Sequence, residues 1–484
     1  MSRSTTLKAS ALAAVLTALI APTAAFAQAL PPTDLEGALG SIDLTWIAVG
    51  IILVFFMQAG FAFLEIGFSR GKNVGAGIAK ILVNFSVGLV AWWAIGYAIV
   101  SGGDGWFAGN SGFFFQVGRD VAGESADAFG AADFVFGYTF AAVALAIVWG
   151  ATLERVKFVV YPIFALVFAG IIYPLIAHWG FGGGLFAEIG DGVQDFAGSS
   201  VVHLTGATAA LAGCLLLGPR KGKYGPDGKP RAIPGHSMPL FGLGVLILWL
   251  GWFGFNGASG AATDGQYMEA IGVTNLGAAG GVIGALIAVQ FTLKSLDVGM
   301  IGNGAIAGLV AVTAPAGYIE FWAAPLVGFI GGVIVVYGVL WFERIGVDDP
   351  VGATSAHGLA GIWGTLACGI FTSPRILEQF GGDGREGLVY GGGVYQLGVQ
   401  AAAVVLTFVT VFALSYATFY AIKVTIGIRS DDEAEDAGLD ISDHGMYGYP
   451  EQFIPPAELV GYGGPTTTTP PVPATAMSTK ESTV

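Results

Sequence analysis

Two histidines stand alone inside apolar stretches of the sequence, and both have the same kind of neighbour. His203 and His357 are each followed, eleven residues later, by one of the two cysteines of the chain, Cys214 and Cys368. Ionisable side chains are costly to bury in apolar segments, and they usually face a cavity or a partner. The matched spacing predicts two copies of one helix, each bringing an imidazole to a shared place.

Two neutral imidazoles can share a hydrogen bond, because each ring has one donor and one acceptor nitrogen. Burial disfavours the charged form, so both rings are expected to be neutral. Such a pair could meet a small molecule that both donates and accepts hydrogen bonds, or pass a proton between the rings. For either histidine alone, the alternative is a polar packing residue bonded to a nearby carbonyl.

A second group of candidates ends an apolar run, in Trp252-Phe253-Gly254-Phe255-Asn256-Gly257-Ala258-Ser259. Trp252, Phe255 and Ser259 recur at a spacing of three or four, so a helix would place them on one face. An indole face attracts a desolvated cation within about 6 Å, and a serine hydroxyl can accept one N–H. The pattern predicts a small cation site near the outer surface. An aromatic belt at the membrane interface is the alternative.

An aspartate precedes the helix that carries the first histidine. Asp195 stands five residues before Ser200, where the apolar helix is expected to begin. A carboxylate there can accept N–H groups that the first helical turn leaves unpaired, and the helix dipole adds to the attraction. We therefore expect Asp195 to stabilise the start of the helix.

The composition predicts an all-α polytopic membrane protein. The chain has 484 residues, of which 54% are hydrophobic and 11% charged, and its mean hydropathy is +0.71; these values are too apolar for a soluble domain. Two cysteines inside predicted spans argue against a disulfide framework or a Cys-based zinc site, and no metal site is predicted. The net charge of −14 argues against nucleic acid as a partner.

Eleven apolar segments meet the requirement of about 20 residues for a helix that crosses the bilayer. The first five and the next five form two halves, and an odd number of spans inverts the second half, as in many transporters. An eleventh, long helix follows these two inverted five-helix repeats. The spans run approximately over 44–68, 76–100, 133–151, 158–177, 200–217, 239–256, 272–293, 300–317, 321–341, 355–371 and 394–420.

The basic residues predict the orientation of the chain. With the N-terminus outside, the outer loops receive only three of them, Arg119, Arg375 and Arg385. The cytoplasmic side receives fourteen: Arg70, Lys72, Lys80, Arg155, Lys157, Arg220, Lys221, Lys223, Lys229, Arg231, Lys294, Arg344, Lys423 and Arg429. This bias follows the positive-inside rule and predicts the N-terminus outside and the C-terminus inside.

The N-terminal end resembles a secretory signal peptide over residues 1–27. Basic Arg3 and Lys8 precede an apolar run, and Ala25-Phe26-Ala27 forms a cleavage pattern. A short uncleaved first span is the alternative. In either case, residues 28–43 are expected on the periplasmic side.

The C-terminal end differs from the eleven-helix domain, which is predicted to occupy residues 44–428. Residues 429–449 are acidic and polar and are expected to form an ordered cytosolic segment with a regulatory role. Residues 450–484 are rich in proline and threonine without an apolar period, so this tail is predicted to be largely disordered.

The run Asp195-Phe-Ala-Gly-Ser-Ser-Val-Val-His203, followed by Gly206-Ala207, resembles the signature of the ammonium transporter family (Amt/Mep/Rh), bacterial Amt type. The resemblance extends over about residues 43–449. Further matching motifs are Phe63-Leu64-Glu65-Ile66-Gly67, Arg70-Gly71-Lys72-Asn73, Leu153-Glu154-Arg155, Gly251-Trp252-Phe253-Gly254-Phe255-Asn256, Asp348-Asp349-Pro350, His357-Gly358 with Gly361, and Gly438-Leu439-Asp440 with His444-Gly445.

This resemblance implies roles for several residues. His203 and His357 would be the twin pore histidines, and Phe140 and Phe255 would be the stacked outer gate. The resemblance also implies a homotrimeric transporter or channel of the bacterial plasma membrane, with one pore in each subunit. It implies no enzymatic activity and no cofactor.

The same resemblance implies an external ammonium site lined by Trp252 and Ser259. Asp195 would order the vestibule loop rather than contact the substrate. Many members carry a tryptophan before the three glycines of that loop, whereas this chain has Phe181 before Gly182. A phenylalanine ring binds cations less strongly than an indole, so this position would recruit ammonium less strongly.

The predicted transport takes ammonium, or methylammonium as an analogue, from this outer site and passes it on as ammonia. A bare cation in a dry pore would cost of the order of 20 kcal/mol, so deprotonation is favoured. An ammonium sensor that hardly conducts and an intramembrane bis-histidine haem protein are the alternatives. In relatives, a PII signal protein blocks the cytosolic face, where residues 220–231 form a basic loop in this chain.

Overall fold

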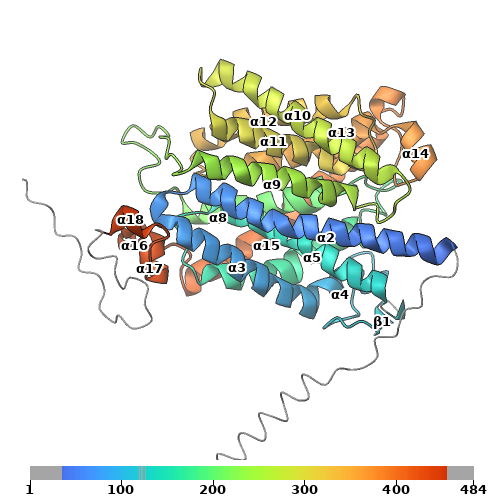
Figure 1. Cartoon of the computed structure of the whole chain (residues 1–484), viewed down its shortest axis with the longest axis horizontal. Coiled ribbons are helices and arrows are strands. Elements are labelled where there is room, and N and C mark those ends of the chain that lie inside the picture. The colour runs from blue at the N-terminus through green and yellow to red at the C-terminus, as the bar shows by residue number, and fades with distance from the viewer. Residues whose placement is uncertain (1–34, 119, 122–123, 126, 455–484) are drawn as a thin grey trace, which may run out of the picture. The chain divides into compact units, whose positions relative to one another are not determined.

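The computed structural model describes residues 35–118, 120–121, 124–125 and 127–454 (Figure 1). The predicted signal peptide, and the part of the predicted disordered tail that follows residue 454, lie outside the described residues. The chain divides into two units, Met1–Thr45 and Trp46–Val484. The described part of the first unit is the helical start of α2, and the site lies wholly in the second unit.

Helices make up nearly all of the regular structure that is described. The α-helices are α2 (Leu35–Phe68), α3 (Val74–Ala91), α4 (Tyr97–Ser101), α5 (Ala128–Ala151), α6 (Val160–Val167), α7 (Tyr173–Gly180), α8 (Thr205–Leu217), α9 (Met238–Gly257), α10 (Gln266–Thr292), α11 (Val298–Thr313), α12 (Ala324–Arg344), α13 (Ala360–Phe371), α14 (Pro374–Phe380), α15 (Tyr395–Thr425), α16 (Asp432–Ala437), α17 (Leu439–His444) and α18 (Pro450–Phe453).

Shorter elements join or extend these helices. Three are 3₁₀ turns, η1 (Gly71–Asn73), η5 (Ala314–Gly317) and η7 (Leu388–Tyr390). Four are π-helical turns, η2 (Trp92–Gly96), η3 (Phe168–Ile172), η4 (Ser199–Leu204) and η6 (Thr354–Leu359). A two-residue antiparallel pair, β1 (Asp120–Val121) and β2 (Glu124–Ser125), is the only sheet in the described residues. The prediction of an all-helical membrane protein is confirmed at this level.

Within the described residues, ten helical stretches are long and apolar enough to cross a membrane. They coincide with ten of the eleven predicted spans, and π-helical turns join the pieces of three of them, including Gly71–Ser101 and Val160–Gly180. The remaining predicted span, 355–371, is helical as η6 and α13 but is not one of the ten. The count of eleven, the inverted halves and the orientation of the termini therefore stay predictions.

Two polar side chains are buried where the sequence did not indicate it. Lys80, counted with the cytoplasmic basic residues, is buried in α3, where it forms an ion pair with the equally buried Glu65 of α2; a charge can be buried in this way only with a partner. His178, which directly follows the predicted span 158–177, lies in the last turn of α7, and its ring nitrogens bond the carbonyls of Val100 and Gly105 at 2.7 and 2.5 Å.

The helix ends also differ from the prediction at both termini. The helix α2 begins at Leu35, so part of the predicted periplasmic segment, 28–43, is helical. At the other end, Pro450–Phe453 forms the short helix α18 inside the tail that was predicted to be largely disordered. Hydropathy marks where a helix enters the lipid, but a helix can continue past the apolar stretch.

Glycines let the helices α10 and α12 pack closely. A Cβ atom added at Gly328 of α12 would lie 1.9 Å from the carbonyl oxygen of Gly277, and one at Gly332 would lie 2.0 Å from that of Gly281. The two contacts are one helical turn apart on each helix, so any side chain there would push the helices apart. Figure 1 shows α10, α11 and α12 side by side. Small residues at such crossings are typical of helices packed in lipid.

Candidate functional site

The carboxylate of Asp195 organises the start of the helix that carries His203. It accepts four backbone N–H groups, those of residues 198–201, at 2.8 to 3.0 Å. Burial raises the pKa of Asp195 to about 6, while these four hydrogen bonds act in the opposite direction. At neutral pH the group is therefore mainly ionised and only accepts. Both of its oxygens accept hydrogen bonds from the backbone, which agrees with the predicted structural role.

The helix that carries His357 begins in a matching way. Asp349 stands eight residues before His357, as Asp195 does before His203. Its carboxylate accepts three backbone N–H groups, at 2.7 to 3.2 Å, and the hydroxyl of Thr354 at 2.7 Å. This second cap was not foreseen, although the equal Asp-to-His spacing was present in the sequence.

The two helix starts also share their backbone conformation. Gly198 and Gly352, each three residues after its aspartate, have positive φ values of 110° and 75°. A π-helical turn follows in both, η4 and η6, and each turn contains the histidine. Single π-helical turns occur frequently at functional sites. The shared cap, glycine and turn support the interpretation as two copies of one helix.

The two histidines meet in the interior. Their Nδ1 atoms lie 3.2 Å apart, and their rings are 5.2 Å apart at an angle of 25°. One Nδ1 must donate and the other accept, so the bond requires that the two rings are not both cationic. The Nε2 atom of His203 is buried and has no hydrogen-bond partner among the described residues. A buried ring nitrogen without a partner is uncommon and calls for an explanation.

Aromatic rings continue from the histidine pair in one direction. The rings of Trp252 and Phe255 lie 5.2 and 5.4 Å from the ring of His203, at angles of 23° and 30°. Phe255 in turn stacks on Phe140, at 4.0 Å and 16°. Trp252 is fully buried, and its Nε1 donates to the Thr313 hydroxyl at 2.9 Å. The phenylalanine pair that the family resemblance implied is thus stacked, and Phe255 of this pair lies directly against His203.

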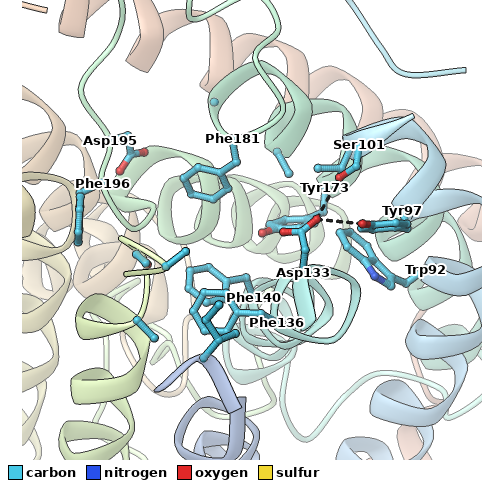
Figure 2. Close-up of a pocket in the computed structure, with 18 of the residues that line it drawn as sticks. Trp92, Tyr97, Ser101, Asp133, Phe136, Phe140, Tyr173, Phe181, Asp195 and Phe196 are labelled. Carbon is cyan, nitrogen blue, oxygen red and sulfur yellow. Dashed lines mark hydrogen bonds between the residues drawn. The ribbon is translucent and has the colours of Figure 1, made fainter. Parts of the chain in front are cut away.

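Beyond these phenylalanines lies a cavity of about 500 Å³, here called the Phe181 cavity (Figure 2). Its walls include four of the predicted site residues, Phe140, Phe181, Asp195 and Ser259. The Ser259 hydroxyl donates to the Phe255 carbonyl at 2.7 Å, which leaves its oxygen free to accept. Trp252 does not line this cavity; it lies one ring deeper, beside His203.

The Phe181 cavity is also lined by residues that were not predicted from the sequence as site residues. Asp133 of α5 lines it together with Trp92, Tyr97 and Tyr173. The Asp133 carboxylate accepts the Tyr97 hydroxyl at 3.0 Å, and Figure 2 shows these two side chains pointing toward each other. A signal was available, because Asp133 stands seven residues before Phe140, a spacing that places both on one helix face.

Two further cavities lie on the other side of the histidine pair. A small cavity of about 20 Å³ is lined by His357, Phe61, Asn303 and the buried Glu65. This is about the size that holds one water molecule. A wider cavity of about 340 Å³ follows, here called the Arg220 cavity, whose walls include Arg220, and Asn303 borders both.

Buried ion pairs hold the loops around the Arg220 cavity. Arg220 donates to both oxygens of Asp348 at 2.9 Å and lies 3.4 Å from Glu154, which also binds Arg70 at 2.6 Å. Burial acts to raise the pKa of Asp348. The hydrogen bonds and charge of Arg220, together with the charge of Arg155, outweigh burial and lower this pKa to about 2.

The C-terminal segment packs against the start of α3. The carboxylate of Asp440 in α17 accepts the backbone N–H of Ala76 at 2.8 Å, and the Leu439 N–H donates to the Asn73 side chain at 2.9 Å. Lys72 donates to the backbone carbonyl of Glu435 at 2.7 Å. Residues 432–444 are therefore held by directed bonds to the helical domain.

The described residues form ten apolar helices of membrane-spanning length and a column of stacked rings with a cavity on each side, which define a polytopic membrane protein of the transporter or channel class. No group of three or more His, Cys, Asp or Glu side chains that could hold a metal occurs in the described part of the chain. The chain belongs to the Ammonium Transporter Family, whose model matches residues 45–449.

Sequence identity to individual relatives supports this membership. The chain is 42% identical to the ammonium transporter Amt2 of Archaeoglobus fulgidus over 430 residues, 86% of this chain and 90% of the relative. It is 32% identical to the ammonium transporter of Bacillus subtilis over 422 residues, 85% of this chain and 99% of the relative. The family resemblance inferred from the motifs is confirmed.

Solved structures show the same fold. A structure named Sensor Amt Protein matches with a TM-score of 0.78 and 32% identity, over 85% of this chain and 100% of that chain. Candida albicans Mep2 matches with a TM-score of 0.74 and 25% identity, over 83% of this chain and 88% of that chain.

Proposed function

We propose that this chain moves ammonium across a bacterial plasma membrane, through a path that runs from the Phe181 cavity, past His203 and His357, to the Arg220 cavity. The observation that carries the proposal is the pair of buried, mutually bonded imidazoles between a stacked phenylalanine pair and a second cavity. Membership of the family supports ammonium as the substrate.

In this proposal, ammonium enters the Phe181 cavity and is partly dehydrated beside Phe181 and Ser259. Phe140 and Phe255 form a gate that must separate before anything passes. The column behind the gate is apolar, and transfer of a bare cation into it would cost of the order of 20 kcal/mol. Loss of the proton is therefore favoured, and ammonia enters the column. Potassium cannot lose a proton and would be rejected.

The unpartnered Nε2 of His203 provides a reason for the histidine pair. Ammonia both donates and accepts hydrogen bonds, so it can satisfy this buried nitrogen whichever tautomer is present. The buried position of Trp252 beside His203 supports a role at the inner end of the gate rather than in the external ammonium site that the family resemblance implies.

We further propose eleven spans in two inverted halves, with the N-terminus outside and the C-terminus in the cytoplasm. The matched starts of the helices at Asp195 and Asp349 support the two halves. In this orientation the Arg220 cavity and the docked segment 429–449 face the cytoplasm. A cytosolic PII-type protein is the proposed partner there. A homotrimer is the proposed assembly, and cross-linking in mild detergent tests it.

A sensor that binds ammonium but hardly conducts is the second candidate, because one of the similar solved structures carries the name Sensor Amt Protein. The haem alternative is disfavoured, because the two imidazoles bond each other directly, with Nδ1 atoms 3.2 Å and ring centres 5.2 Å apart, and a porphyrin does not fit between them. A flux measurement separates the transporter from the sensor, since both would bind ammonium.

The experiment is uptake of methylammonium or ammonium into proteoliposomes, with simultaneous recording of current. Uptake above that of empty vesicles supports transport. Binding without uptake would favour the sensor and overturn the proposed transport. Uptake with current would show that charge crosses, whereas uptake without current would show net movement of ammonia.

A further inference from the structure

We infer that Asp133 forms a second cation-binding subsite in the Phe181 cavity, separate from Ser259 and Phe181, for ammonium and other small monovalent cations. The inference rests on the proposed function for its direction, since the cation is expected to arrive from this cavity. Asp133 lies on α5, five residues after the helix begins at Ala128. Nothing in the family motifs of the sequence includes it.

The carboxylate of Asp133 faces the cavity without a cationic partner. Its Oδ2 atom accepts hydrogen bonds from the hydroxyls of Tyr97 at 3.0 Å and Ser101 at 3.4 Å, and Figure 2 shows these three side chains together. Asp133 is nevertheless an exposed residue. None of the ion pairs formed by the described residues includes Asp133. The two hydroxyls orient the carboxylate but do not neutralise it, so a cation can complete the site.

The charges around the cavity favour a cation. The lining residues include two acids, Asp133 and Asp195, and neither lysine nor arginine is among those described. Asp195 directs its oxygens at four backbone N–H groups, so Asp133 supplies the carboxylate that remains available. A cleft with charge of one sign and walls of low dielectric concentrates the counter-ion.

Aromatic rings connect this carboxylate with the gate. Asp133, Phe136 and Phe140 recur at positions i, i+3 and i+7 of α5, so they form a row along one helix face. The rise from Asp133 to Phe140 is about 10 Å, at about 1.5 Å per residue. The rings of Phe136 and Phe140 are 4.7 Å apart, and Phe140 stacks on Phe255. A cation that leaves the carboxylate therefore passes ring faces, which attract it.

This subsite explains how the chain functions with Phe181 where an indole is expected. A carboxylate attracts a cation more strongly than a phenylalanine ring does, so Asp133 can restore the local ammonium concentration. It cannot tell ammonium from potassium, because both carry one positive charge and have similar size. We therefore assign Asp133 to recruitment and leave selectivity to the gate and the histidine pair.

The test compares Asp133→Asn, Asp133→Glu and the control Glu378→Gln in proteoliposomes at low ionic strength. Asn keeps an oxygen that accepts the Tyr97 hydroxyl but removes the charge, and Glu keeps the charge. Glu378 is an exposed acid of α14 outside the cavity, so its replacement changes the net charge equally. For Asp133→Asn, the ammonium concentration at half-maximal uptake should rise about fivefold, as for loss of one partly screened charge contact.

The other quantities should stay near the wild-type values. Asp133→Glu and Glu378→Gln should keep the half-saturating concentration, and Asp133→Asn should keep the maximal rate and the preference for ammonium over potassium. Added salt should raise the wild-type half-saturating concentration and reduce the difference from Asp133→Asn. An unchanged half-saturating concentration for Asp133→Asn, or an equal rise for Glu378→Gln, would overturn the assignment.

A binding measurement separates this inference from the proposed function. Ammonium that binds the folded protein raises its unfolding temperature in detergent. The rise should be smaller for Asp133→Asn than for wild type at the same ammonium concentration. If wild-type vesicles show no uptake, the transport proposal fails, and this thermal shift still decides on Asp133. Equal shifts in wild type and Asp133→Asn would refute the subsite.

Discussion

Replacing Asp195 is the most direct test of how the helix of His203 is held. Asp195→Ala removes both acceptor oxygens and leaves four buried backbone N–H groups, those of residues 198–201, without their partner. A buried N–H that loses its partner costs about 1 kcal/mol or more, so the four together predict a loss of about 4 kcal/mol in the free energy of unfolding. This is a large part of the stability of an ordinary protein.

Asp195→Asn should be milder because it keeps one oxygen. That oxygen can accept two of the four N–H groups, whereas the new amide group is a donor and cannot accept the other two. We expect a loss of about 2 kcal/mol, half that of Asp195→Ala. Asp127→Ala is the control, because Asp127 is an exposed cap of α5 that accepts two N–H groups. Its loss should be about 1 kcal/mol.

The assay is thermal unfolding of purified protein in detergent, with yield and proteoliposome uptake measured in parallel. The unfolding temperatures should decrease in the order wild type, Asp127→Ala, Asp195→Asn and Asp195→Ala. The reasoning is refuted if Asp195→Ala unfolds at the wild-type temperature. Normal stability together with abolished uptake in both Asp195 variants would instead indicate that the charge acts directly on the substrate.

Three further predictions concern other parts of the chain. His203→Ala or His357→Ala should change the rate or the ion selectivity of uptake more than the yield. Either change removes one partner of the hydrogen bond between the two rings, and the buried ring that is left without its partner costs about 1–3 kcal/mol. Normal transport in both single variants and in the double variant would contradict the proposed pore. Asp348→Asn removes the nearer of the two carboxylates that pair with the buried guanidinium of Arg220, leaves only Glu154 at 3.4 Å, and should cost about 3 kcal/mol in unfolding experiments. Because the pKa of Asp348 is lowered to about 2, its contribution is complete above about pH 4 and is lost as the pH falls toward 2; a stability difference between wild type and Asp348→Asn that stays constant down to pH 2 would contradict this. Deleting residues 430–484 should lower uptake or its control by a PII protein, whereas deleting 465–484 should change neither, and equal behaviour of the two truncations would contradict a role for the docked segment.

The sequence by itself determined the class of protein and most of its helices. In lipid, every backbone N–H and C=O must be paired within the protein, so a long apolar stretch can hardly be anything but a helix. Ten of the eleven segments predicted on this ground are apolar helices of sufficient length. The histidine pair was also predictable, because His203 and His357 repeat one local pattern, and repeated patterns fold into repeated elements.

Side chains that depend on contacts between distant helices were decided only by the tertiary structure. Lys80 was counted with the cytoplasmic basic residues at the start of the predicted span 76–100, and only the approach of α2 reveals its buried partner Glu65. Trp252 shares a helix face with Ser259, yet it stacks on His203 while Ser259 lines the cavity. Asp133 shares a helix face with Phe140, but this spacing alone does not mark a site, and Asp133 becomes a candidate only when α4 and α7 close the cavity around it. Periodicity specifies which face of a helix is apolar, but which faces meet depends on packing across the whole chain.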